Sequence, residues 1–70
     1  MRHELIDVRV NDYGSVMLIT PLTRQAKEWI EMNVEQEPWQ WLGESIAIEP
    51  RYAGDLAFAM EMDGLNVIGA

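Results

Sequence analysis

The chain has 70 residues and a mass of 8.0 kDa, which suits one small domain, residues 1–70, and excludes two separate hydrophobic cores. Apolar residues make up 49% of it, so the composition is that of a folding chain and not of a disordered one. Twelve acidic against five basic residues give a formal charge of −7, which disfavours direct binding to nucleic acid, and the lack of cysteine excludes disulfides and cysteine-ligated metal centres.

The first two predicted elements are strands joined by a short turn. Ile6, Val8 and Val10 alternate with Asp7 and Arg9, which indicates a strand with one apolar and one charged face, as at the edge of a sheet. Residues 11–14 have the Asn, Asp and Gly content of a turn, and residues 15–20 form a second strand that is apolar on both faces. Because the connection is short, we expect an antiparallel hairpin with the second strand central in the sheet or covered by a partner.

A helix is predicted from about Arg24, because Pro21 ends the second strand and Thr23 can act as the N-cap. One face of this helix gathers Ala26, Trp29, Ile30 and Asn33, with Val34 at its border. The opposite face is expected to carry three glutamates, Glu28, Glu31 and Glu35. Residues 35–43 are predicted to form a loop, since Pro38 disfavours helix at the residue before it.

The remaining predicted elements are a third strand, a second helix and a short final strand. The third strand spans residues 45–49, with Ile46 and Ile48 on one face. The second helix starts at Pro50 and runs to about Met62, and Gly64 has the position of a C′ residue. We expect one face of this helix to hold Tyr52, Leu56, Ala59, Met60 and Asp63, and we expect Phe58 and Met62 to be partly exposed. Residues 65–68 form the final strand.

The element order ββαβαβ predicts an α+β or small α/β fold, in which a short mixed sheet carries two helices on one face. Each strand–helix–strand segment is expected to form a right-handed crossover. The other face of the sheet then lacks cover, which favours a homodimer or a bound partner.

Charge is distributed unevenly along the chain. Residues 1–27 have three acids and four bases, a net of +1, whereas residues 28–70 have nine acids and one base, a net of −8. We therefore predict an acidic, aromatic surface that binds a basic protein partner, formed by Glu28, Glu31, Glu35, Glu37, Trp39 and Trp41. The alternative is that the two tryptophans fill the core and the glutamates form a solvated face. A stronger version of the hypothesis is that the carboxylates mimic nucleic-acid phosphates.

No pattern in the sequence indicates a reaction. His3, the only histidine, stands at the N-terminus, and neither Ser15 nor Ser45 has the setting of a nucleophile elbow. There is no glycine-rich phosphate loop and no calcium-loop spacing. We therefore predict a non-enzymatic protein with no catalytic residues, no metal and no cofactor. The longest apolar run, residues 56–60, is far shorter than the about 20 residues of a membrane span, so we expect a cytoplasmic protein without membrane contact.

Three stretches of the chain together have a familiar pattern. They are residues 14–23 (GSVMLITPLT) with Ala26 and Trp29, residues 49–52 (EPRY) leading to Asp55 and Leu56, and residues 63–65 (DGL). They resemble a group of short, uncharacterised proteins of bacterial genomes and of phages or other mobile elements, over about residues 14–65. Members of that group have a glycine-flanked hydrophobic pair before the third strand, where this chain has the more acidic residues 41–45 (WLGES).

The resemblance implies a biological context and no chemistry. Small acidic proteins of mobile elements often bind and block a host protein, including CRISPR effector complexes. The alternative function is therefore a phage-type inhibitor, anti-CRISPR-like or a DNA mimic, that blocks a host nucleic-acid-binding protein complex. Within the shared stretch, Arg51 is expected to pair with Glu49 or Asp55, and Tyr52 is expected to pack under the sheet.

Overall fold

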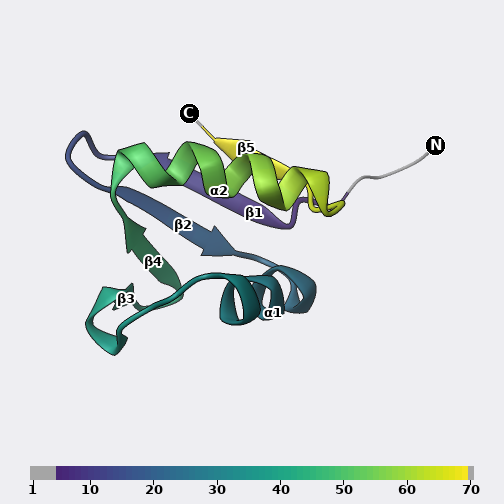
Figure 1. Ribbon diagram of the computed structural model, residues 1–70, viewed down its shortest axis with the longest axis horizontal. Helices are drawn as coiled ribbons and strands as arrows, with labels where there is room; N and C mark the ends of the chain where they lie inside the picture. The colour runs from purple at the N-terminus through teal and green to yellow at the C-terminus, as the bar shows by residue number, and fades with distance from the viewer. Residues whose placement is uncertain (1–4, 70) are drawn as a thin grey trace.

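The computed structural model describes residues 5–69, in which seven strands and α-helices follow one another in the order ββαββαβ (Figure 1). The elements are β1 (Val8–Asp12), β2 (Met17–Pro21), α1 (Arg24–Asn33), the 3₁₀ helix η1 (Pro38–Gln40), β3 (Trp41–Leu42), β4 (Ser45–Ile48), α2 (Pro50–Met62) and β5 (Val67–Gly69). The predicted α+β class, with a mixed sheet and two helices, is confirmed. The predicted loop at residues 35–43 is wrong in part, because it contains η1 and β3.

The five strands form one sheet in the order β3-β4-β2-β1-β5. β5 is parallel to β1, and every other neighbouring pair is antiparallel. The predicted β1–β2 hairpin and the central position of β2 are confirmed. The prediction that β1 is an edge strand is wrong, because β5 pairs with its outer side.

The predicted crossover from β2 through α1 to β4 is also wrong, since β2 and β4 are antiparallel neighbours. The segment between them contains η1 and β3 as well as the helix, and the β3–β4 turn reverses the chain before β4 begins. Gly43 in this turn has φ of 65°, a conformation that glycine adopts without strain. β4 and β5 are parallel but are separated by β2 and β1, so α2 spans the sheet instead of joining adjacent strands.

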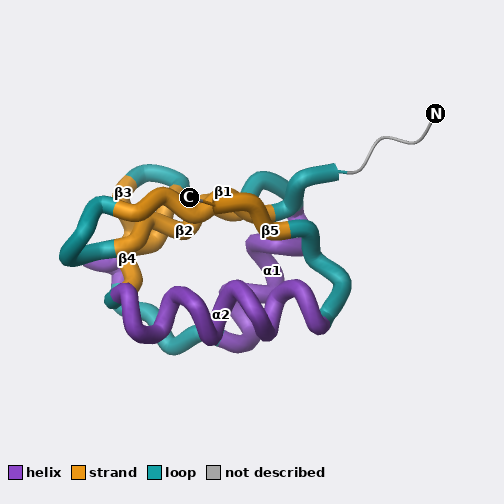
Figure 2. Tube along the Cα trace, turned by 90° about the horizontal axis from the view of Figure 1, so that it is seen from above, coloured by secondary structure: helices purple, strands orange, loops and turns teal. Residues whose placement is uncertain are grey.

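Both helices lie on the same side of the sheet, as predicted (Figure 2). The side chains that fill the space between the two layers alternate along the strands and recur at helical spacing on α1 and α2. The buried apolar residues are Val8, Val10, Ile19, Ala26, Ile30, Ile46, Ile48, Ala53 and Met60. The radius of gyration is 11.5 Å, close to the about 11 Å expected for a folded chain of this length.

Neither of the described helices covers the other face of the sheet, and the residues on that face explain why it can be exposed to water (Figure 2). The strand register places Arg9 opposite Thr20, and the Thr20 and Ser45 hydroxyl oxygens lie 2.6 Å apart on this face. The apolar residues Leu42 and Ile68 stand at the two edges. A mixed face of this kind is usual for a solvated side of an antiparallel sheet, so it does not by itself require a partner. The homodimer stays a prediction.

Asp7 occupies a position that the alternation along the first strand does not predict. Its side chain is 6% exposed, although the sequence pattern placed it on a charged outer face. One carboxylate oxygen accepts a hydrogen bond from the Thr23 hydroxyl (2.7 Å) and the other from the backbone N–H of Asn66 (2.9 Å). The Leu22 amide donates to the Asp7 carbonyl (2.7 Å). Asp7 therefore links the start of β1 to the beginning of α1 and to the chain entering β5.

The first turn and the end of α2 follow the predicted signals, and its buried face does so in part, since Met60 is buried and Leu56 packs against the core as predicted. Pro50 begins the helix, and Gly64 (φ of 93°) ends it in a Schellman motif, in which the Leu65 amide donates to the Met60 carbonyl (3.0 Å). The buried residues are Ala53 and Met60, whereas Tyr52 is 55% exposed. The expectation that Tyr52 packs under the sheet is therefore wrong. Phe58 and Met62 are exposed, as predicted.

Candidate functional site

A groove of about 740 Å³ opens where the end of α1, the end of β4 and the start of α2 meet. The more buried residues that line it are apolar and form its floor: Val16, Val34, Ala47, Ile48 and Leu56. The exposed residues form its rim and are mostly acidic: Asn33, Glu35, Glu49, Tyr52 and Asp55, with the partly buried Gln40 beside them. An apolar floor with a few convergent polar groups is the usual form of a binding site.

The local sequence explains why three elements end at this groove. α1 ends at Asn33, and Val34 is extended, with its amide donating to the Ile30 carbonyl (2.9 Å). A single residue, Glu49, separates the last residue of β4 from the first residue of α2. The Gln40 side chain donates to the Ala47 carbonyl (3.2 Å), which ties η1 to β4. These connections join the elements that line the groove to one another.

The charges around the groove favour a cationic ligand. Three carboxylates stand on the rim, Glu35, Glu49 and Asp55, and none of the described residues that line the groove is basic. The carboxyl end of α1 and the amino end of α2 carry partial charges of about −0.5 and +0.5, which oppose each other. The rim carboxylates therefore determine the sign of the local potential, and that potential is negative.

The predicted glutamates do not form one row. Glu28 and Glu31 are exposed on α1, but Glu35 lies beyond the end of the helix, so the prediction of three glutamates on one helical face is wrong. The backbone leaves the helical conformation at Val34, four residues before Pro38. Glu35 lines the groove, whereas Glu37 is an exposed residue that precedes η1 and donates its amide to the Gln40 side chain (2.8 Å).

The predicted tryptophans lie in the segment that follows. Trp41 is partly buried in β3, packs against the hydrophobic core and donates its indole N–H to the Gln36 side chain. Trp39 belongs to η1, and its side chain lies outside the described part of the structure. Trp29 also packs against the core, as predicted, and its indole N–H donates to Asp63 (2.6 Å). Trp41 therefore contributes to the fold and not to the groove.

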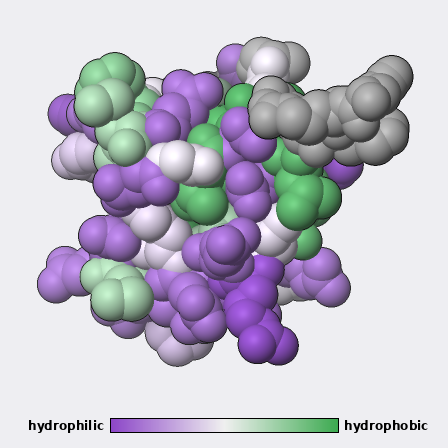
Figure 3. All heavy atoms as spheres, turned by 90° about the vertical axis from the view of Figure 1, so that its right-hand side faces the viewer, coloured by the Kyte–Doolittle hydropathy of each residue, from purple (hydrophilic) through white to green (hydrophobic). Residues whose placement is uncertain are grey.

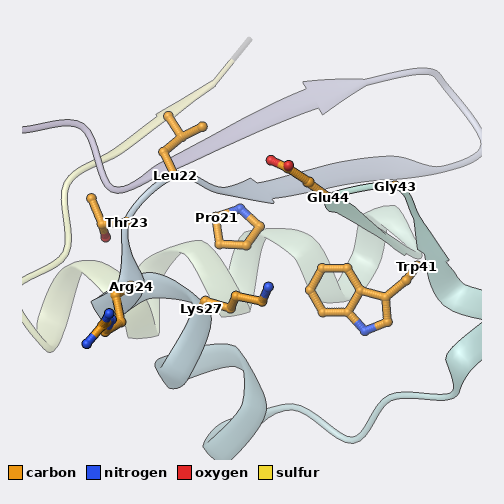
Figure 4. A pocket seen from close by; sticks show the side chains of 8 residues that line it. All are labelled: Pro21, Leu22, Thr23, Arg24, Lys27, Trp41, Gly43 and Glu44. Atoms are coloured by element: carbon orange, nitrogen blue, oxygen red, sulfur yellow. The ribbon is translucent and has the colours of Figure 1, made fainter.

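A second, smaller hollow of about 280 Å³ lies between α1 and the β3–β4 turn. Lys27 extends toward the indole of Trp41, whereas Arg24 points away from it (Figure 4). Glu44 lines the opposite side, and the Thr23 hydroxyl is already hydrogen-bonded to Asp7. This hollow is small and of mixed charge, so it favours no one class of ligand.

The described residues, 5–69, provide no cluster that could hold a metal ion. No three His, Cys, Asp or Glu side chains of this range are placed to hold a metal ion. Ser45 is paired with the Thr20 hydroxyl, and His3 lies outside the described residues. In the same range no helix has the length and apolar character of a membrane span.

The sequence pattern missed Glu49, Tyr52 and Asp55 as site residues. The sequence indicates part of this site, because Tyr52 and Leu56 are one helical turn apart and therefore share a face of the predicted helix. At the start of α2 that face looks onto the groove instead of the sheet. The groove forms only because the end of α1 lies beside the start of α2. The local sequence pattern does not specify this arrangement.

Comparisons with known proteins add no family to this description. The chain matches no protein-family model, no curated protein and no solved structure. The resemblance to bacterial and phage proteins therefore stays a prediction.

Proposed function

We propose that this protein is a non-enzymatic interaction module that binds a basic protein partner through its acidic side. The observation that carries the proposal is the groove, in which an apolar floor is surrounded by the carboxylates of Glu35, Glu49 and Asp55. The proposed setting is the cytoplasm of a bacterium, with the gene carried by the host or by a mobile element.

The two parts of the groove have different physical effects on binding. Burial of apolar surface stabilises a complex by roughly 25 cal/mol per Å², although only part of this appears as affinity. The carboxylates act mainly on partner choice and on the rate of encounter. The net charge of −8 on residues 28–70 adds to this attraction, and the formal charge of −7 on the whole chain opposes association with a second copy. A basic protein is therefore favoured over self-association.

The inhibitor alternative receives less support from the structure. A mimic of DNA or RNA needs carboxylates in a regular row, and α1 provides two exposed glutamates, Glu28 and Glu31, instead of three. Inhibition by simple occupation of a basic surface stays compatible with the proposal, because it needs only the same groove.

Two variants of equal charge test the proposal. The groove variant is Glu35→Gln, Glu49→Gln and Asp55→Asn, and the control variant is Glu28→Gln, Glu31→Gln and Glu61→Gln, which removes three exposed carboxylates that do not line the groove. Each protein is immobilised and exposed to a lysate of the organism that carries the gene, and bound proteins are quantified by mass spectrometry. We expect a basic protein to bind the parent and the control variant but not the groove variant. Equal capture by the two variants would contradict the proposal.

A further inference from the structure

The aromatic wall of the groove already contacts a guanidinium. Tyr52 lines the groove and is 55% exposed. The Arg51 guanidinium carbon lies 5.6 Å from the centroid of the Tyr52 ring, which is within the range of a cation–π interaction. Arg51 is the only basic residue in the acidic part of the chain, residues 28–70. The Tyr52 ring therefore already has a guanidinium beside it in the free protein.

Carboxylates stand on either side of this ring along the chain. Glu49 is the N-cap of α2, three residues before Tyr52, and Asp55 follows Tyr52 by three residues; all three residues line the groove. Both carboxylates are exposed. A carboxylate can receive two parallel N–H bonds from a guanidinium, which no ammonium group can supply in the same planar geometry. The surroundings of Tyr52 thus suit arginine better than lysine.

Leu56 lies one helical turn beyond Tyr52 and lines the groove together with Val34. Both are partly buried, and both are among the apolar residues that pack against the hydrophobic core. An apolar side chain next to the bound cation would cover this floor. The site therefore has two parts, a cation position at the ring and an apolar position beside it.

We propose that the groove recognises an arginine side chain of its partner, which stacks on Tyr52 between Glu49 and Asp55 while a neighbouring apolar residue covers Leu56 and Val34. Arg51 occupies the ring in the free protein and is displaced when the partner binds. The inference rests on the proposed function and specifies which basic residue is recognised. A second copy of the chain is the competing occupant, since Leu22, Arg24 and Lys27 form a basic corner with an exposed leucine, but the charge of −7 on each copy opposes that pairing.

Three short synthetic peptides of equal length test the inference. Each contains one leucine flanked by two arginines, two lysines or two glutamines in a neutral background, with both ends blocked. Binding is followed by chemical-shift changes in the ¹⁵N-labelled full chain. We expect the largest shifts at Val34, Tyr52 and Leu56, an affinity for the arginine peptide about three- to tenfold higher than for the lysine peptide, and no binding of the glutamine peptide.

Substitutions at the ring separate recognition of arginine from general attraction. Tyr52→Leu should reduce the preference for arginine to less than twofold, whereas Tyr52→Phe should retain it. Arg51→Gln should raise the affinity for the arginine peptide more than Lys27→Gln does, because both remove one positive charge but only Arg51 competes for the ring. The melting temperature of each variant confirms that it is folded.

The outcomes distinguish the inference from the function on which it rests. Equal affinities for the arginine and lysine peptides, unchanged by Tyr52→Leu, would overturn the inference and leave the proposed function standing. No shift at the groove with either basic peptide would overturn both. Concentration-dependent shifts at Leu22, Arg24 and Val34 without any peptide would identify a second copy as the occupant and overturn the choice of partner.

Discussion

Carboxylates have opposite roles in two regions of this molecule. Asp7 is buried next to the start of β1 and accepts hydrogen bonds from Thr23 and Asn66, so its carboxylate holds separate parts of the fold together. The carboxylates of the groove rim are exposed. A buried carboxylate whose two oxygens both accept hydrogen bonds stabilises the fold. Exposed carboxylates contribute little to the free energy of unfolding, and they stay available to a ligand. The predictions below test this contrast, and they run from the largest expected effect to the smallest.

Asp7→Ala should lower the free energy of unfolding by about 2–3 kcal/mol, because it leaves the Thr23 hydroxyl and the backbone N–H of Asn66 without their acceptor. Urea denaturation followed by circular dichroism measures the change. For a chain of this length each kcal/mol corresponds to roughly 4–8 °C in melting temperature. Glu61→Gln is the control, since Glu61 is exposed and should change stability by less than about 0.5 kcal/mol. If Asp7→Ala also changed the free energy of unfolding by less than about 0.5 kcal/mol, the difference between the buried carboxylate and the exposed ones would not hold.

Thr23→Ala should lower the free energy of unfolding by about 1–2 kcal/mol. The Thr23 hydroxyl oxygen accepts from the Ala26 amide (3.2 Å) as the N-cap of α1 and donates its proton to Asp7. Because the two residues share one hydrogen bond, the double variant with Asp7→Ala should lose less stability than the sum of the single variants. Denaturation of all four proteins gives this coupling, and strict additivity would show that Asp7 and Thr23 act independently.

The contrast also shows which features a sequence can predict. The Thr23 cap, the start of α2 at Pro50 and its end at Gly64 were predicted because each depends on the backbone within a few residues. β3 has two residues, too few to show an alternating pattern. The sequence pattern predicts the buried face of α2 correctly at Met60 but not at Tyr52, because the apolar residues of this helix occupy more than one face.

Long-range pairing determines what the sequence pattern missed. β1 became an interior strand only because β5, from the far end of the chain, pairs with it, and the same approach of the chain ends buries Asp7 against Asn66. The groove likewise needs the end of α1 to lie beside the start of α2. Of the predicted site residues whose side chains the structure describes, Glu35 alone lines the groove. No local pattern specifies these arrangements, because their partners are distant in sequence.

Gly54→Ala should raise the free energy of unfolding by about 0.5–1 kcal/mol without weakening peptide binding. Gly54 lies within α2, and a Cβ there meets no atom within 4 Å, so alanine gains helix propensity without a clash. Gly64→Ala is the matched variant and should lower the free energy of unfolding, because φ of 93° is strained for any residue with a Cβ. Thermal denaturation of both variants makes the comparison. A lower free energy of unfolding in Gly54→Ala would mean that the surroundings of α2 near the groove do not tolerate a Cβ at this position.

The groove variant, Glu35→Gln, Glu49→Gln and Asp55→Asn, should have the smallest effect on stability. Its free energy of unfolding should stay within about 0.5 kcal/mol of the parent, because exposed side chains contribute little. Relief of like-charge repulsion favours a small gain, which should shrink as salt shortens the screening length from about 10 Å at 0.1 M to about 3 Å at 1 M. Denaturation at the two salt concentrations measures this. A stability loss comparable to that of Asp7→Ala would show that the rim carboxylates hold the fold together and are not free for a partner.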